Sequence, residues 1–257
     1  MHDVPKPMDI AAYLDRINYR GPLECDAETL RQLQLAHLRS VPFENLSIHA
    51  GEPIVLNDDA LFEKIVKRKR GGFCYELNGL FSALLRTLGF KVERLSAQVA
   101  NAAGEFSCDF DHMTLMVTLA EPWLVDVGFG ESFVEPLRVD ERGPQLQAGR
   151  AYRIEAADHY LVGLQFDDQE NAWKPFYRFT LTPYDYPDFE ELCRFHQTSP
   201  ESHFTQNRIC SMLTPSGRIS LTGAQLIVTA GGERSEQPIS TPEQYERLLR
   251  ENFGIAM

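Results

Sequence analysis

Apolar residues recur every three to four positions through the first third of the chain. This spacing is typical of helices that pack one face against a core. It predicts three helices in residues 9–70 and a fourth, the most regular, over residues 74–88, which Gly89 is placed to end. Residues that commonly cap helices stand at the starts of the first three: Asp9, Asp26 and Asn57.

After Gly89 the apolar spacing changes from every third or fourth residue to every second. Such alternation is typical of half-buried strands. Clusters of Pro and Asp separate the alternating runs, as expected for turns, so we predict a mostly antiparallel sheet or barrel. The predicted strands cover residues 95–99, 113–119, 123–127, 152–154, 160–166 and 176–181.

The alternation breaks at residues 183–192, with the sequence PYDYPDFEEL. Two short strand-like runs follow at residues 218–221 and 225–229, and a helical pattern covers residues 242–250. We therefore expect a small unit of mixed strands and helix at the end of the chain.

The composition is that of an ordinary globular protein. Of the 257 residues 43% are hydrophobic and 24% are charged, which excludes a disordered, collagenous or coiled-coil chain. At roughly 150 residues per domain, the length allows one or two domains whose cores need no metal or disulfide. The formal charge of −12 disfavours phosphate backbones and anionic lipid, so we expect no nucleic-acid or membrane partner.

Cysteine usage and the first residues indicate the compartment. The five cysteines are an odd number without a CxxC pair, which favours reduced thiols over a disulfide framework. Residues 1–10 lack the apolar stretch of a signal peptide, and no apolar run reaches the ~18 residues of a membrane span. We expect a cytoplasmic protein.

Cys74 is the first candidate for chemistry. The segment RGGFCYELNGLF over residues 70–81 places it in the first turn of the predicted helix, directly after two glycines. Unpaired N–H groups and the helix dipole favour an anion there, so the thiol is a candidate nucleophile and its own N–H a candidate half of an oxyanion hole. From this segment alone, a buried cysteine that merely begins a core helix is an equally good interpretation.

A cysteine nucleophile needs a base and a group that orients the base. His112 opens one predicted strand, and Asp126 interrupts the next, where a buried carboxylate requires a partner. With a loop over residues 120–122, Met116 faces Asp126, so His112 and Asp126 share a face but lie four residues apart. Their contact then requires a bulge or strong twist. The alternative for His112 is a histidine satisfied by backbone groups.

Four segments in this order make the sequence recognisable as similar to a known family. They are VPFENL at residues 41–46, RGGFCYELNG at 70–79, DVGFG at 126–130 and FGI at 253–255. Together they resemble the arylamine N-acetyltransferases over nearly the whole chain. The resemblance implies that Cys74, His112 and Asp126 form a catalytic triad.

The resemblance also implies an α+β fold in three parts, with the catalytic groups arranged as in papain. An N-terminal helical bundle, residues 1–89, carries the nucleophile, and a central antiparallel β-barrel, residues 90–191, carries the histidine and aspartate. A connecting segment, residues 192–210, leads to a C-terminal α/β lid, residues 211–257.

The implied activity is acetyl transfer from acetyl-CoA to the nitrogen of arylamines or arylhydrazines. It proceeds by a ping-pong mechanism through an acetylated cysteine and uses no metal. The implied partners are therefore a small aromatic amine or hydrazine and coenzyme A.

Further residues receive roles from the same resemblance. Glu44 and Arg70 are implied to form an ion pair that braces the loop before Cys74. Phe43 and Phe129 are implied to lie near the aromatic acceptor, where rings pack on rings.

Coenzyme A has no phosphate-binding loop in this sequence, and the net charge opposes an anionic cofactor. The resemblance alone assigns Gly130 and Phe204 to the walls of its site. His196 stands where many relatives have Asn, which leaves the contacts near Phe204 open.

Three alternatives remain open. The same triad serves Cys-dependent amide synthases and hydrolases, because both use acyl-enzyme chemistry. A binding module without activity is another interpretation. A Cys2His2 zinc site of unusual spacing is a third, with four candidate ligands: Cys193, His196, His203 and Cys210.

Overall fold

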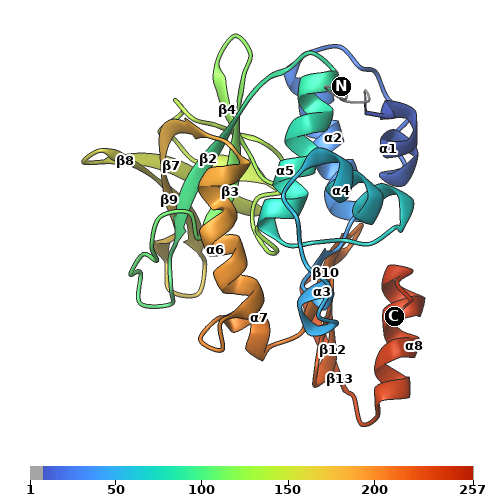
Figure 1. The fold of residues 1–257 in the computed structure, drawn as a ribbon. Helices are drawn as coiled ribbons and strands as arrows, with labels where there is room; N and C mark the ends of the chain where they lie inside the picture. Colours follow the sequence, from blue (N-terminus) through green and yellow to red (C-terminus); the bar gives the residue numbers. More distant parts are fainter. Residues whose placement is uncertain (1–7, 257) are drawn as a thin grey trace.

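The computed structural model describes residues 8–256 (Figure 1). Residues 1–7 and Met257 lie outside the described residues. Residues 1–7 include most of the stretch that, by its sequence, lacks a signal-peptide pattern. Within residues 8–256, no helix combines the length and the apolarity that a membrane crossing requires.

The first part of the chain is helical, as the apolar spacing predicts. The three predicted caps are confirmed: Asp9, Asp26 and Asn57 each accept a hydrogen bond from a backbone N–H three residues later. The third predicted helix is shorter than expected, because its second half widens into a π-helical turn. The elements are α1 (Ile10–Arg16), α2 (Ala27–Ser40), α3 (Leu46–His49), α4 (Asp58–Phe62), the π-turn η1 (Glu63–Lys67) and α5 (Cys74–Thr87).

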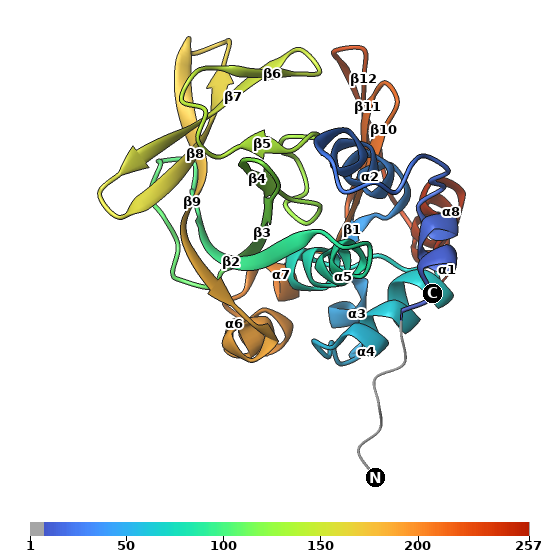
Figure 2. The same ribbon diagram turned by 90° about the horizontal axis from the view of Figure 1, so that it is seen from above.

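Helix α5 is the central element of the molecule. Its residues from Cys74 through Leu85 are all buried, although their pattern predicts a single apolar stripe. The reason is that α5 packs against strands β2 (Lys91–Val99) and β3 (His112–Thr118) on one side and against helices α1 and α4 on the other (Figure 2). The first turn of α5 is therefore held rigidly at the boundary between the helices and the sheet.

The middle of the chain forms an eight-stranded antiparallel sheet in the order β5-β4-β3-β2-β9-β8-β7-β6. The sheet curls into a nearly closed barrel (Figure 2). The side chain of Gln145 links its two edge strands: it accepts from the Arg138 N–H at 2.8 Å and donates to the Arg138 carbonyl at 3.0 Å. The remaining strands are β4 (Pro122–Val125), β5 (Leu137–Arg138), β6 (Gln145–Gln147), β7 (Arg150–Ala157), β8 (Tyr160–Asp167) and β9 (Ala172–Tyr184).

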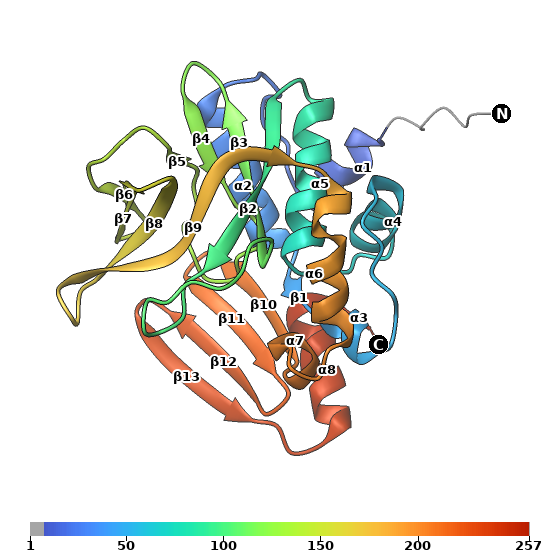
Figure 3. The ribbon, with the colours of Figure 1, turned by 60° about the vertical axis from the view of Figure 1, so that its left-hand side comes forward.

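The last part contains a five-stranded antiparallel sheet in the order β1-β10-β11-β12-β13, with helix α8 beside it (Figure 3). Strand β1 comes from the helical part and joins the two parts through β10. The predicted strands over 218–221 and 225–229 and the predicted final helix are confirmed; β10 and β13 were not predicted. The elements are β1 (Phe43–Glu44), β10 (Ile209–Thr214), β11 (Gly217–Thr222), β12 (Gln225–Ala230), β13 (Glu233–Pro238) and α8 (Pro242–Phe253).

The predicted α+β class, with helical bundle, antiparallel barrel and C-terminal α/β unit, is confirmed. The division at residues 89, 191 and 210 stays a prediction. Between barrel and C-terminal sheet lie helices α6 (Tyr186–Thr198) and α7 (His203–Gln206), and α6 continues without a break across residue 191.

Candidate active site

The pairing of β3 with β4 differs from the predicted register. Thr118 pairs with Pro122, so the loop covers residues 119–121 rather than 120–122. Proline lacks an N–H and is tolerated as the first residue of a strand, which moves the start of β4 back by one position. Continued beyond the last pair, this register sets Asp126 opposite Thr114 instead of Met116. His112 is then two residues away instead of four, and no bulge is needed.

His112 and Asp126 are in direct contact. The Nε2 atom of His112 lies 2.7 Å from the Oδ2 atom of Asp126, and both side chains are buried. Asn78 and the Gly128 N–H each donate to Oδ1 at 2.8 Å, and the Tyr177 hydroxyl donates to Oδ2 at 3.2 Å. Burial alone raises the pKa of this carboxyl, but the His112 charge and these hydrogen bonds outweigh burial and lower it.

Asn78 was not singled out from the sequence, although it lies within the RGGFCYELNG segment, one helical turn after Cys74. Its side chain connects α5 to both strands. The Nδ2 atom donates to the Met113 carbonyl at 2.6 Å as well as to Asp126, and the Oδ1 atom accepts from the Val127 N–H at 2.9 Å. A single buried amide thus fixes the distance between the helix of the cysteine and the strands of the other two residues.

Cys74 occupies the first position of α5 and is 3% exposed. A Cβ atom at Gly128 would lie 2.8 Å from the Cys74 Cα atom and 2.8 Å from the Asn78 side chain. Only glycine permits this close approach. A backbone hydrogen bond from Met113, the residue after His112, reaches the Cys74 thiol. The structure therefore brings the start of β3 and the loop after Asp126 onto the cysteine.

Burial raises the pKa of the Cys74 thiol well above its ordinary value. The hydrogen bond from Met113 opposes this effect, whereas the negative charges of Asp111 and Asp126 reinforce it. A place at a helix N-terminus is therefore not sufficient to make this thiol an anion. An anionic thiolate here requires a positive charge beside it, a role that the family resemblance implies for the imidazole of His112.

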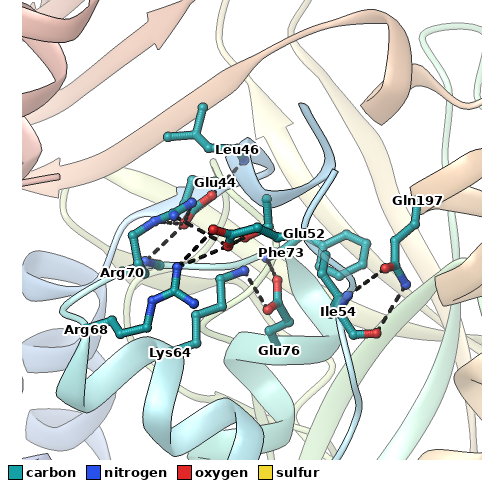
Figure 4. A network of polar contacts seen from close by, with 12 residues as sticks. Glu44, Leu46, Glu52, Ile54, Lys64, Arg68, Arg70, Phe73, Glu76 and Gln197 are labelled. Carbon is teal, nitrogen blue, oxygen red and sulfur yellow. Dashed lines mark hydrogen bonds and ion pairs between the residues drawn. The ribbon is translucent and has the colours of Figure 1, made fainter. Parts of the chain in front are cut away.

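Glu44 and Arg70 form a buried ion pair (Figure 4). The Arg70 Nε and Nη2 atoms lie 3.0 and 2.9 Å from the Glu44 Oε1 atom. The same carboxylate accepts from the Gly71 N–H at 3.2 Å and from the Leu46 N–H at 2.7 Å. This carboxylate ties strand β1 to the loop that leads into Cys74.

Comparison with known proteins identifies the family of this chain. A family model described as N-acetyltransferase matches residues 26–257. Arylamine N-acetyltransferase 2 of Mus musculus is 33% identical, over 97% of this chain and 95% of that protein. The chain belongs to the arylamine N-acetyltransferase family. It is therefore an acyltransferase, as the resemblance of its motifs implies.

Solved structures of family members have the same fold. The arylamine N-acetyltransferase of M. tuberculosis superposes with a TM-score of 0.89 at 32% identity, covering 96% of this chain and 94% of that one. The Mycobacterium marinum arylamine N-acetyltransferase in complex with CoA gives a TM-score of 0.88 at 32% identity, covering 96% and 93%.

The aromatic residues that the family resemblance assigns lie in two groups. The Phe129 ring meets the His112 ring edge to face at 5.1 Å and the Tyr177 ring at 5.2 Å. Phe43 instead lies beside Phe204, with ring centroids 6.1 Å apart. Phe43 and Phe204, which the sequence analysis assigns to different ligands, are therefore neighbours.

The surroundings of Gly130 and Phe204 differ. Gly130 has a φ of +80°, and no atom lies within 4 Å of the place where a Cβ would be. Phe204 packs edge to face on His196 at 5.3 Å. His196 is fixed by Asp111 and Ser202, each 3.1 Å from one ring nitrogen. The residue that departs from the family pattern thus supports one wall of the expected cofactor site.

The structure does not gather the four residues of the zinc alternative. Cys193 accepts from the side chain of Gln197 within its own helix, and His196 is engaged by Asp111. Cys210 faces Glu44 across strands β10 and β1. Among residues 8–256, no three His, Cys, Asp or Glu side chains lie together so that they could hold a metal ion.

Proposed function

We propose that this enzyme transfers an acetyl group from acetyl-CoA to the nitrogen of an arylamine or arylhydrazine through an acetylated Cys74. The observation that carries the proposal is the 2.7 Å contact between His112 and Asp126 beside the first turn of α5. The CoA complex of the Mycobacterium marinum relative supports coenzyme A as the carrier of the acyl group.

In the first half-reaction, His112 takes the proton of the Cys74 thiol. Its Nε2 atom is held by Asp126, which leaves Nδ1 to accept the proton. The thiolate attacks the thioester carbon, and the carbonyl oxygen becomes an oxyanion that the Cys74 N–H stabilises. The tetrahedral intermediate expels the CoA thiolate, which takes the proton back from His112.

In the second half-reaction, the amine nitrogen attacks the acetyl carbon and His112 accepts the proton that the nitrogen loses. The Cys74 thiolate then leaves and the amide is released. Aromatic amines and hydrazines fit this step because they are neutral near pH 7, whereas an alkyl amine arrives protonated. We assign Phe43 and Phe129 to the acceptor and Gly130 and Phe204 to coenzyme A.

Free thiols support a cytoplasmic site for this chemistry. All five cysteines are free in the structure, which is the state expected in a reducing compartment. Fractionation of cells with an antibody against the chain tests this location; recovery with a membrane or secreted fraction overturns it.

Intact-mass analysis after mixing with acetyl-CoA tests the mechanism. We expect a stable acetyl adduct that is absent from the Cys74→Ala variant and is discharged by aniline. Rapid spontaneous loss of the adduct would instead indicate a hydrolase with the same triad. Absence of any adduct would overturn both functions.

A further inference from the structure

A second buried ion pair lies next to the cysteine, and the proposed function does not use it. The Lys64 Nζ atom is 2.7 Å from the Glu76 Oε1 atom, with the two side chains 11% and 1% exposed (Figure 4). The other carboxylate oxygen of Glu76 accepts from the Phe73 N–H at 3.2 Å. One carboxylate therefore joins Lys64 to the residue directly before Cys74.

The π-turn η1 delivers Lys64 to this position. Lys64, Ile65 and Val66 are all buried, and the two apolar residues belong to the core of the helical part. An ordinary amphipathic α-helix buries a single stripe, and a π-turn is often found at functional sites. The widened turn keeps Ile65 in the core and still aims the lysine at Glu76.

Stabilisation of the fold does not explain why this ion pair is buried. Desolvation of two buried charges largely cancels their attraction, so well-packed apolar side chains serve stability equally well. Burial raises the pKa of Glu76, an effect that the Lys64 charge opposes and Glu44 reinforces. Glu76 lies two residues after Cys74, which suggests a different role for the pair. The hydrogen bonds of the first turn of α5 identify this role.

The backbone N–H groups around Cys74 differ in whether they have an acceptor. Glu44 accepts from the Gly71 N–H and Glu76 from the Phe73 N–H. The Glu76 and Leu77 N–H groups donate to the Phe73 carbonyl. Within residues 8–256, the N–H groups of Cys74 and Tyr75 have no acceptor. The two carboxylates thus fasten the backbone at Gly71 and Phe73, just before Cys74, and leave the Cys74 N–H to an incoming anion.

We propose that Lys64 and Glu76 are positioning residues: Lys64 holds the Glu76 carboxylate on the Phe73 N–H, and this contact sets the direction of the Cys74 N–H and thiol. The proposal rests on the proposed role of Cys74 as nucleophile. Phe73 is a buried anchor with no polar side chain to cap the helix, so Glu76 is the group that orders the turn.

Two matched double variants test it: K64M/E76Q and K64M/E76M. Both remove both charges and keep side chains of similar length, but only Gln retains an acceptor for the Phe73 N–H. The charged and titratable groups near Cys74 on other elements stay unchanged in both: Asp111, Asp126 and Cys193, together with His112, which contacts Asp126.

The main readout is the rate of Cys74 alkylation by iodoacetamide against pH, followed on the Cys74 peptide by mass spectrometry. In K64M/E76M we expect the apparent pKa of alkylation to rise by about one unit, so that alkylation at neutral pH is about tenfold slower. We expect kcat to fall similarly while KM for aniline stays unchanged. K64M/E76Q should remain within about threefold of the parent chain.

Equal alkylation profiles for the two variants would overturn the proposal. Loss of the folded state in either variant, seen as loss of its cooperative melting transition, would show a structural role and overturn it equally. The alkylation readout does not require acetyl transfer. If Cys74→Ala retains activity, the proposed function fails even where the alkylation difference is found.

Discussion

Glu44 and Asp126 are two of the buried carboxylates near Cys74, and their charged partners differ in kind. Glu44 is paired with Arg70, whose guanidinium keeps its charge at every working pH. Asp126 is paired with His112, the residue that we propose as the base of the reaction. The remaining donors to both carboxylates are neutral. The loop that leads into the cysteine is thus held through a guanidinium, and the strand after the proposed base is held through an imidazole.

The largest expected effect comes from removing the negative charge beside the imidazole. Asp126→Asn cannot stabilise the imidazolium, and its amide NH2 favours the wrong ring tautomer. We expect kcat for aniline acetylation to fall by about 10⁴-fold, an effect of the size known for such a substitution in serine proteases.

Steady-state kinetics and the melting temperature, measured together, check this prediction. A loss of kcat below about tenfold with an unchanged melting temperature would mean that Asp126 does not act on the proton.

The second effect concerns the Glu44–Arg70 pair. Arg70→Met leaves Glu44 buried and unpaired, so we expect the free energy of unfolding to fall by about 3–5 kcal/mol. The matched control is Arg68→Met, because the side chains of Arg68 and its partner Glu52 are 47% and 42% exposed. For this surface pair we expect at most about 1 kcal/mol.

Urea denaturation of both variants measures the difference. If the two losses agreed within about 1 kcal/mol, the buried pair would contribute no more than a surface pair.

A smaller effect is expected from one of the neutral donors to Asp126. Burial and the Asp126 charge raise the pKa of Tyr177 well above its ordinary value, so its hydroxyl remains a donor at working pH. Tyr177→Phe removes one of the four hydrogen bonds that the Asp126 carboxylate accepts. We expect kcat/KM to fall by about fivefold to tenfold. A loss above about a hundredfold would assign the hydroxyl a direct part in the reaction.

The smallest effect concerns a histidine whose hydrogen-bond partner is a hydroxyl instead of a carboxylate. His37 is buried against the Tyr13 hydroxyl at 3.0 Å, and burial lowers its pKa to about 3. As the pH falls below about 6.5, His37 therefore takes up a proton in the unfolded chain but not in the folded one. The free energy of unfolding decreases as a result. Between pH 7.5 and 6 this lowers the free energy of unfolding by about 0.8 kcal/mol.

The variant His37→Gln should lack this component of the pH dependence. Unfolding free energies of both chains at the two pH values check it. A slope that is the same in both would show that His37 is not the group responsible.

The parts that sequence reasoning predicts well are local. Each helix cap depends on four consecutive residues, and Cys74, His112 and Asp126 lie in recognisable segments. The β3–β4 register was missed by two positions because it depends on whether Pro122 belongs to the loop or to the strand. Tyr177 and Lys64 were missed because long-range packing brings them to the site: Tyr177 lies 51 residues beyond Asp126 in sequence, and Lys64 depends on a π-turn that apolar spacing does not reveal.

Strand β1 is only two residues long, and it pairs with β10, which begins at Ile209. A chain emerging from the ribosome completes the helices of its first third early, since domains tend to fold from the N-terminus during synthesis. The backbone beside Glu44 nevertheless stays without its partner strand until β10 has been made. The backbone before the nucleophile thus acquires its pairing with β10 only late in synthesis.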